Sequence, residues 1–318
     1  MRLQSLAACI IILFVLLLFG CSPATPTEIS SGEEAAACKE MIFSHAFVSS
    51  RGFESNIVAI CPDGSYPRQV TTDGLLYNIM PYWSPDRSQI AFLSARSGTQ
   101  QLHIMDRDGG NVRQLTSGSG LDVGGVVWLP DGNRIAILVS GDGGWHWQAV
   151  DVVTQEITPL DEWTFQEGSF ISMRLSHDGT RLAYLVRTRP EQADSPLEIY
   201  IQDIDGSNTY VLTSDNWIIQ NPIWSPDDSQ IAFLSKSGGT TDQNAIYTIN
   251  LDGSNLQRLI ETDLSPWMIA WSPDGESLAI YADDELYNGV LYTVNIKSGE
   301  KIALFKIEYP NYISHLSW

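Results

Sequence analysis

A short phrase recurs along the chain at nearly constant spacing, and this repetition limits the possible folds more than any other feature. Its form is W-S-P-D-x-x-x-[IL]-A-[FIY], and approximate copies begin at Trp83, Trp128, Leu175, Trp224 and Trp271. The successive starts are 45, 47, 49 and 47 residues apart, and a further 47 residues lead to Trp318. A period of about 40–50 residues with short alternating segments is typical of β-propellers, in which each repeat forms one four-stranded blade.

Each repeat divides into four predicted strands, as the copy at Trp83 illustrates. An extended segment, residues 78–83, leads into the turn Ser84-Pro85-Asp86, where Pro presets φ and Asp can bond its own backbone. Residues 89–93 read as a buried strand and residues 101–105 as an alternating one. After a glycine-containing hairpin turn, residues 112–116 form the predicted fourth strand. All five copies carry alanine at the same place, as close packing of neighbouring sheets requires: Ala91, Ala136, Ala183, Ala232 and Ala279.

The two ends of the repeat region complement each other. Residues 41–71 supply a second, third and fourth strand but no first strand, whereas residues 312–318 read as a first strand with nothing after it. Joining them gives an all-β fold, a six-bladed propeller with four-stranded blades. The C-terminal strand then closes the ring beside the N-terminal blade, which removes exposed sheet edges.

The N-terminus reads as an export signal. Arg2 precedes thirteen uncharged residues, Ala7 to Phe19, which are too few to span a hydrocarbon core of about 30 Å as a helix. Leu18-Phe19-Gly20-Cys21 resembles the lipobox of bacterial lipoproteins, so we expect lipidation of Cys21. An ordinary cleaved signal and an uncleaved anchor are the alternatives. The expected organisation is a signal peptide (1–20), a lipidated Cys with a flexible tether (21–37), and the propeller (38–318), in an extracytoplasmic, membrane-anchored protein.

The cysteines and the net charge indicate the compartment and the kinds of partner that suit this protein. Cys38 and Cys61 flank two predicted hairpin strands, so a disulfide between them is expected in an oxidising compartment; two free thiols are the alternative. The formal net charge is −20. A protein surface with this excess of negative charge repels nucleic acid and anionic lipid headgroups, so no nucleic-acid partner is expected.

The repeat, together with its later segment [DN]-x-D-G-[SG]-N and the ending R-x-L-T, resembles the TolB-like six-bladed propellers over residues 41–318. One copy reads Trp224-Ser225-Pro226-Asp227 and continues to the turn Asp252-Gly253-Ser254-Asn255. The resemblance implies the propeller fold and a role in the cell envelope. The expected partner is a protein or glycan of the cell envelope.

A binding face is predicted where aromatic and acidic residues share loops between second and third strands and between blades. The predicted loops between second and third strands include Ser49–Ser55, Ser140–His146, Arg187–Ser195 and Ala282–Asn288. Such exposed aromatics beside acids suit a sugar or a basic peptide. Trp217 and Trp267 stand in the predicted loops between blades, and the alternative to their exposure is packing within the core. The candidate binding residues are Trp145, Trp163, Asp283, Asp284, Glu285 and Tyr287.

No G-x-S-x-G nucleophile motif occurs, so we expect a binding or scaffolding module for a protein or glycan rather than an enzyme. The alternative is a polysaccharide lyase or esterase with its site in the central channel. The predicted inner strands contribute few polar residues to that channel: Arg174, Asn221 and His315. No cofactor and no metal are expected, and the chain is expected to be a monomer anchored to a membrane through its lipid.

Overall fold

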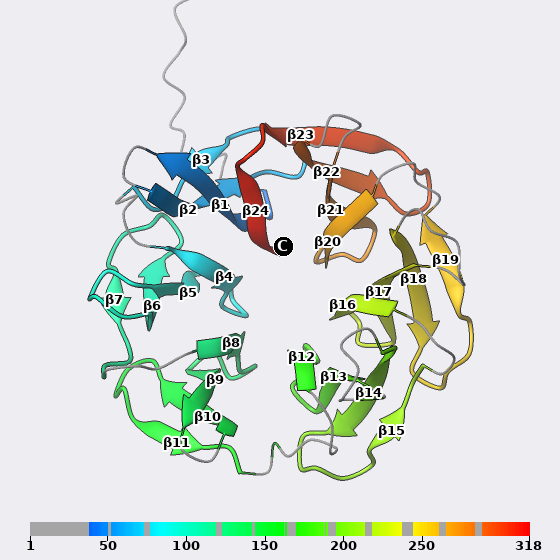
Figure 1. Ribbon diagram of the computed structural model, residues 1–318, viewed down its shortest axis with the longest axis horizontal. Helices are drawn as coiled ribbons and strands as arrows, with labels where there is room; N and C mark the ends of the chain where they lie inside the picture. Colours follow the sequence, from blue (N-terminus) through cyan, green and yellow to red (C-terminus); the bar gives the residue numbers. More distant parts are fainter. Residues whose placement is uncertain are drawn as a thin grey trace, which may run out of the picture.

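The computed structural model describes residues 38–318, except residues 50–51, 73–76, 119–122, 142–143, 162, 164–169, 188, 190–194, 214–217, 237–243, 261–264 and 284–287. Within the described residues, strands β1 to β24 form six four-stranded antiparallel sheets arranged as blades in a ring (Figure 1). The predicted all-β, six-bladed propeller is therefore confirmed. No helix in this described part of the chain could span a bilayer. The predicted signal, Cys21 and the tether lie outside the described residues.

Strand bounds follow the same order in every blade, from the inner strand to the outer edge. The first strands face the axis: β24 (Tyr312–Ser317), β4 (Ile79–Trp83), β8 (Val123–Trp128), β12 (Phe170–Leu175), β16 (Ile218–Trp224) and β20 (Ser265–Trp271). The second strands are β1 (Met41–Ser49), β5 (Gln89–Ser94), β9 (Arg134–Gly141), β13 (Arg181–Arg187), β17 (Gln230–Lys236) and β21 (Ser277–Asp283). The third strands are β2 (Gly52–Ile60), β6 (Gln101–Asp106), β10 (Gly144–Asp151), β14 (Leu197–Asp203), β18 (Asn244–Asn250) and β22 (Gly289–Asn295). The outer strands are β3 (Arg68–Gln69), β7 (Arg113–Gln114), β11 (Ile157–Pro159), β15 (Tyr210–Val211), β19 (Gln257–Ile260) and β23 (Lys301–Ile307).

The ring closes through its C-terminal strand, as predicted. Strand β24 pairs antiparallel with β1, so that Ile42 lies opposite Ser317 and Ala46 opposite Tyr312. Blade 1 therefore has the strand order β24-β1-β2-β3, and its inner strand comes from the other end of the chain (Figure 1). Blades 2 to 6 follow in sequence order. Closure gives each inner strand a hydrogen-bonded partner in its blade. The backbone N–H and C=O groups at that edge are therefore not open to pairing with other chains.

The hydrophobic core is divided among the interfaces between blades. Buried side chains form six clusters in the described residues, one at each interface of adjacent blades. The five motif alanines are fully buried in this packing, as the sequence predicts. The motif tryptophans join blades by hydrogen bonds as well: Trp128 Nε1 donates to Tyr82 O at 3.1 Å, and Trp224 Nε1 to Arg174 O at 3.0 Å. Trp318 is only half-buried, so it packs less deeply than Trp128 and Trp224 do.

The Ser-Pro-Asp turn holds itself together through its own side chains. Ser84 Oγ donates to Asp86 Oδ1 at 2.7 Å, and the same oxygen accepts from Ser88 N at 3.0 Å. Gln89 N in turn donates to Ser84 Oγ at 2.9 Å, where the second strand begins. The hydrogen bond from Ser84 lowers the pKa of Asp86 below its ordinary value, because it stabilises the charged form. This local network confirms that Asp bonds its own backbone at the turn.

The fourth strands are shorter than the sequence predicts. Only Arg113–Gln114 of the predicted strand over residues 112–116 forms a regular strand. The reason lies in the R-x-L-T ending, because Thr116 Oγ1 accepts from Leu102 N at 3.0 Å in place of a backbone carbonyl. Thr71 and Thr213 make the corresponding bonds to Ile57 N and Ile199 N, each at 2.9 Å. Threonine therefore ends the outer strand with its side chain.

Two of the predicted loops are mostly strand. In blade 1, β1 runs to Ser49 and β2 begins at Gly52, so Phe53 pairs with Val48 instead of lying in a loop. In blade 3, Trp145 of β10 pairs with Ser140 of β9. The predicted loops Ser49–Ser55 and Ser140–His146 are wrong because the antiparallel pairing of the two hairpins continues into them, to Ser49 and Gly52 in blade 1 and to Gly141 and Gly144 in blade 3.

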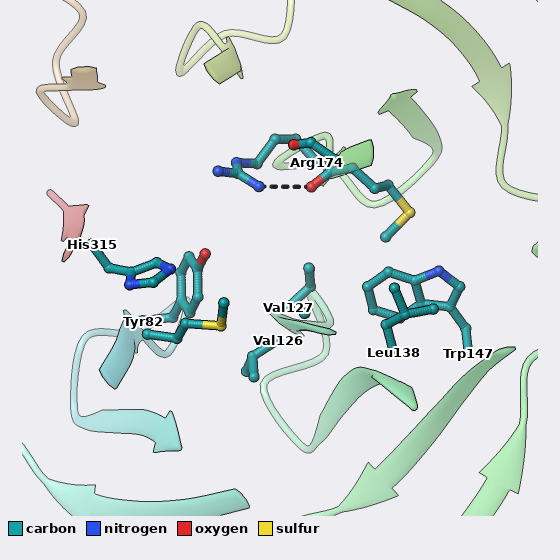
Figure 2. A pocket seen from close by; sticks show the side chains of 11 residues that line it. Tyr82, Val126, Val127, Leu138, Trp147, Arg174 and His315 are labelled. Atoms are coloured by element: carbon teal, nitrogen blue, oxygen red, sulfur yellow. Dashed lines mark hydrogen bonds between the residues drawn. The ribbon is translucent and has the colours of Figure 1, made fainter. Parts of the chain in front are cut away.

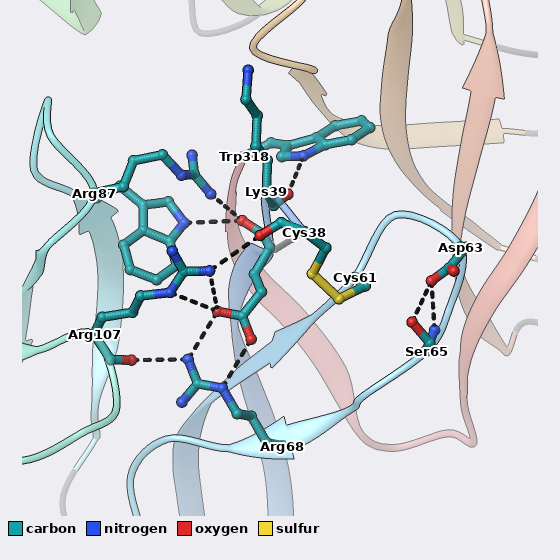
Figure 3. The surroundings of a disulfide bond; sticks show 11 residues. Cys38, Lys39, Cys61, Asp63, Ser65, Arg68, Arg87, Arg107 and Trp318 are labelled. Carbon is teal, nitrogen blue, oxygen red and sulfur yellow. Dashed lines mark hydrogen bonds and ion pairs between the residues drawn. A yellow bond between two sulfur atoms is a disulfide. The ribbon is translucent and has the colours of Figure 1, made fainter. Parts of the chain in front are cut away.

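The segment from Cys38 to Glu40 fastens the closing blade to its neighbours (Figure 3). A disulfide joins Cys38 to Cys61, with Cα atoms 5.9 Å apart. Lys39 O accepts from Trp318 Nε1 at 2.8 Å, and Glu40 O accepts from Trp83 Nε1 at 3.2 Å. Three consecutive residues thus contact the C-terminus, blade 1 and blade 2.

Glu40 in this segment accepts hydrogen bonds from three arginines, two at its carboxylate and one at its backbone carbonyl. Glu40 is fully buried, and Arg68 forms a two-bonded pair with it at 2.9 and 3.0 Å. Arg107 Nη2 donates to Glu40 Oε2 at 3.1 Å and to Cys38 O at 3.1 Å. Arg87 donates to Glu40 O and lies over the Trp83 ring, 4.8 Å from its centroid. Burial, and next the charge of Arg107, lower the pKa of Arg87 to about 10. The sequence analysis missed this network, because its members are 28 to 67 residues apart.

Candidate functional site

Every inner strand bends where it passes the central axis. A register shift interrupts its pairing in each blade, for example between Ile79 and Tyr82 in β4 and between Gln220 and Ile223 in β16. Met80 and Asn221 take positive φ values of 53° and 50° at these shifts. β-bulges re-aim side chains and are common beside binding sites. Here they turn side chains of the inner strands toward the axis.

The bulges select two positions of each repeat as channel wall. The first position lies three residues before the motif tryptophan or its equivalent: Met80, Gly125, Ser172, Asn221, Met268 and His315. The second lies one residue before it: Tyr82, Val127, Arg174, Ile223, Ala270 and Ser317. All of these except Met268 line one of two cavities of about 220 and 180 Å³, which share Tyr82 and Arg174. The wall thus combines apolar side chains with polar ones.

Arg174 is the charged group in this wall. Its Nη1 donates to Met173 O at 2.9 Å (Figure 2). Its Nη2 makes a long contact of 3.5 Å with Asn221 Oδ1. No carboxylate pairs with it within the part of the chain that the structure describes. A guanidinium presents five donors in a planar fork that matches a carboxylate. The channel therefore offers positive charge to a ligand.

His315 and Tyr82 lie on the opposite side of the same cavity. Figure 2 shows the Tyr82 ring beside His315, with the Tyr82 hydroxyl directed toward the side on which Arg174 lies. Burial, and next the charge of Arg174, lower the pKa of His315 to about 4. At neutral pH the imidazole is consequently uncharged, and it can donate or accept one hydrogen bond at each nitrogen. Arg174, Asn221 and His315, the polar inner-strand residues predicted from the sequence, thus come together.

The predicted binding face is only partly described. Asp283 lies at the end of β21, where its Oδ2 accepts from Trp267 Nε1 at 2.8 Å. The Trp267 side chain is 52% exposed, so its alternative placement in the core is wrong. Asp284, Glu285, Tyr287 and Trp217 lie outside the described residues, and so does the side chain of Trp145.

Trp163 differs from its prediction as an exposed aromatic. Its side chain is only 6% exposed and stacks at a tilt on Trp147, with ring centroids 5.4 Å apart. Both rings belong to the core between blades 3 and 4. The sequence around Trp163 is polar, which is why it predicts an exposed ring. The outer strand β11 ends shortly before Trp163, whose backbone N donates to Leu160 O at 3.0 Å. This turn directs the ring inward.

The sequence did contain a signal for the channel wall. Counting back from each motif tryptophan by three residues and by one residue identifies the lining positions, because the bulge has the same place in every repeat. The two positions are two residues apart, as expected for side chains on one side of a strand. Among the described residues, no group of three or more His, Cys, Asp or Glu side chains is placed to hold a metal ion.

Comparisons with known proteins agree with this architecture. Residues 175–307 match the family model of the TolB beta propeller domain, PD40. Among curated proteins, the uncharacterized peptidase YuxL of Bacillus subtilis is 29% identical over 126 residues, which are 39% of this chain and 17% of that protein. The Tol-Pal system protein TolB of Hamiltonella defensa is 31% identical over 80 residues, which are 25% of this chain and 18% of that protein. The matches therefore span less than a fifth of either relative.

Solved structures extend the likeness over most of the chain. TolB from Acinetobacter baumannii has a TM-score of 0.69 at 17% identity, covering 88% of this chain and 66% of that one. An oligogalacturonate lyase in complex with manganese has a TM-score of 0.56 at 19% identity, covering 85% and 74%. At such identities the likeness concerns the fold, which carries different functions in different proteins.

Proposed function

We propose that this chain, a TolB-like six-bladed β-propeller, is a binding module of the cell envelope that receives a negatively charged group of a protein partner in its central channel. The observation that carries the proposal is Arg174, a guanidinium without a carboxylate partner in the described structure, set in a wall of mixed apolar and polar side chains. The module works outside the cytoplasm and is held at a membrane by a lipid on Cys21.

The physical reason is the cost of an unpaired charge. A guanidinium in a partly apolar cavity lacks part of its hydration, and a carboxylate restores favourable hydrogen bonds at short distance. Both cavities open onto Arg174, so a ligand can reach it from either side. The uncharged His315 and the Tyr82 hydroxyl add hydrogen-bonding groups without adding a repelling negative charge.

The envelope location rests on three separate features. The N-terminus has the pattern of a lipoprotein signal. The Cys38–Cys61 disulfide fits an oxidising compartment, since such bonds persist mainly outside the cytosol. Several similar proteins are named as TolB of the Tol-Pal system.

Replacing Arg174 tests the channel directly. We expect Arg174→Gln to weaken capture of membrane partners by about 1.5–3 kcal/mol, the usual worth of a hydrogen bond to a charged group, while Arg174→Lys retains part of the affinity. Cross-linking and affinity capture from solubilised membranes, followed by quantitative mass spectrometry, measure the effect. Arg113→Gln, an exposed arginine on outer strand β7, is the matched control. Equal recovery of the partners by wild type and Arg174→Gln would place the binding site elsewhere.

Anchoring is tested at Cys21. We expect Cys21→Ser to move the protein from the membrane fraction to the soluble fraction, because a lipid on its thiol supplies the proposed attachment. Fractionation followed by a high-salt wash measures this, with Cys9→Ser in the predicted signal as control. Sedimentation of Cys21→Ser with membranes after that wash would refute the lipid anchor.

A second function, that of a polysaccharide lyase or esterase, is favoured by one observation. Arg174 and His315 line the same cavity, and a cation beside an uncharged imidazole could neutralise a carboxylate while a proton is removed next to it. Incubating the purified protein with polygalacturonate and with simple esters separates the two functions. Turnover that is lost in His315→Ala would establish the enzyme, whereas binding without turnover supports the binding module.

A further inference from the structure

The larger cavity is asymmetric, and one glycine is the cause. At the position three residues before the motif tryptophan, blade 3 has Gly125, where the other blades have methionine, serine, asparagine or histidine. The missing side chain leaves the inner strand β8 open toward the interior of the blade. Leu138 of β9 and Trp147 of β10 therefore line the channel cavity, although they belong to the second and third strands.

The contact between Gly125 and Trp147 is tight. A Cβ atom at Gly125 would lie 3.1 Å from Trp147 Cη2 and 3.7 Å from Leu138 Cβ. The indole has little freedom to withdraw, because its side chain is 4% exposed and packs on Trp163. Any side chain at Gly125 would therefore occupy the space between the inner strand and the indole.

This part of the cavity is an apolar subsite beside a cation. Val126, Val127, Leu138, Trp147 and Met173 line it, and Arg174 lines the same cavity. Figure 2 shows Leu138 beside Trp147, with Val126 and Val127 between them and Tyr82. The whole cavity of about 220 Å³ is smaller than the roughly 300–1,000 Å³ of pockets that enclose drug-sized molecules. It therefore suits a small group, such as one amino-acid residue, rather than a folded segment.

We propose that the channel recognises the C-terminal residue of a partner peptide, with its free carboxylate on Arg174 and its apolar side chain in the subsite opened by Gly125. This inference rests on the proposed function and specifies its ligand. In a C-terminal residue one carbon atom carries both the carboxylate and the side chain, which matches one small cavity lined by both a guanidinium and apolar side chains. An internal Asp or Glu has a carboxylate but no apolar group on the same carbon.

The charge of the protein adds a requirement on the rest of the peptide. With a formal net charge of −20, the protein repels acidic peptides at long range and attracts basic ones. We therefore expect the preferred ligand to have a single carboxylate at its end and lysine or arginine before it. Such a sequence would be drawn to the molecule as a whole, with its only anion placed on Arg174.

Isothermal titration calorimetry with four probes tests the proposal on the purified propeller. The first probe is an acetylated tetrapeptide of two lysines, alanine and a C-terminal leucine with a free carboxylate. The second is its C-terminal amide, the third ends in glycine, and the fourth is decanoate. We expect the free leucine acid to bind at least about tenfold more tightly than the amide, since a charge-assisted bond is lost, and also more tightly than the glycine peptide. Equal binding of acid and amide would overturn the proposal, and so would a preference for decanoate over every peptide.

Variants then separate the subsite from the channel as a whole. Gly125→Met, which introduces the residue of Met80 and Met268 into blade 3, should remove the preference for leucine over glycine but keep the preference for acid over amide. Val153→Met adds the same side chain at a position that is 76% exposed, and should change neither preference. Gly125→Ala, a smaller change, should reduce the leucine preference and serves if the methionine variant does not fold.

The outcomes distinguish this inference from the proposed function. If Arg174→Gln abolishes capture of the native partners while leucine and glycine peptides bind Gly125→Met and wild type alike, the chain-end recognition is wrong and the channel function stands. If Arg174→Gln leaves both capture and peptide binding unchanged, the channel function fails and the inference fails with it.

Discussion

Deletion of residues 312–318 is expected to abolish cooperative unfolding of the propeller. The deletion removes β24, and with it the antiparallel pairing to β1 and the inner strand of blade 1. It also takes Ile313, which is 1% exposed, out of the core cluster between blades 6 and 1, together with Leu316 and Trp318. Two sheet surfaces then face water, and the free edge of β1 can pair with other chains. Urea unfolding followed by fluorescence measures the loss of cooperativity, and light scattering of the protein in buffer measures the aggregation.

Complementation provides the control for this deletion. A synthetic peptide with the sequence of residues 312–318 should bind the truncated protein and restore part of its stability in proportion to concentration, because it binds only the folded ring. Tyr312→Ser, a change at a residue that is 45% exposed, should keep the cooperative transition of the full chain. A truncated protein with the wild-type unfolding midpoint would show that β24 is not what closes the ring.

This closing strand also shows how far the sequence alone predicts the fold. The distance of 47 residues from Trp271 to Trp318 is sufficient to assign residues 312–318 as an inner strand and to pair them with the N-terminal blade. The motif alanines are equally predictable, since the same small residue recurs at a position that proves fully buried in every copy. Both features belong to the repeat. Because equivalent residues make the same contact in every blade, the contact can be predicted from several copies at once.

The features that depart from the repeat were not predictable in this way. Trp163 follows a polar loop, yet it is buried against Trp147, which is a contact between an outer connection and a third strand. Gly125 reads as an ordinary glycine in a strand until the neighbouring indole is placed beside it. A single sequence gives the period of a strand, but it does not give which side chain from another strand fills the space that a glycine leaves.

The same division applies to the candidate site. The polar residues Arg174, Asn221 and His315 are identifiable from the sequence as inner-strand positions, and the structure groups them around two cavities. That no carboxylate of the described residues pairs with Arg174 could be learned only from the structure, because the 38 acidic residues of the sequence offer many possible partners. At the other charged cluster, Glu40 is so placed that it meets Arg68 and Arg107 at once. Among the described residues, arginine is thus paired with a carboxylate at the closure but not in the channel, and this difference is why we propose a binding role for Arg174.

Glu40→Ala is expected to lower the free energy of unfolding by about 3 kcal/mol, the lower part of the range for removing one member of a buried ion pair. Its side chain is 1% exposed, whereas the side chains of Arg68 and Arg107 are each 28% exposed and can regain some hydration when the carboxylate is lost. Arg87 should be less affected, because it donates to the Glu40 carbonyl, which the alanine variant keeps. Glu40→Gln should cost less than Glu40→Ala, since an amide oxygen still accepts from one arginine.

Urea denaturation measures this change as a lower midpoint at an unchanged m value, which excludes an altered denatured state. Glu276→Ala is the matched control, because Glu276 and Lys297 form an ion pair at 3.4 Å with side chains 59% and 80% exposed. Such exposed pairs contribute about 0–1 kcal/mol. If Glu40→Ala were no more destabilising than Glu276→Ala, the Glu40 carboxylate would not help to hold the closing blade, and the disulfide and β24 would hold it without that carboxylate.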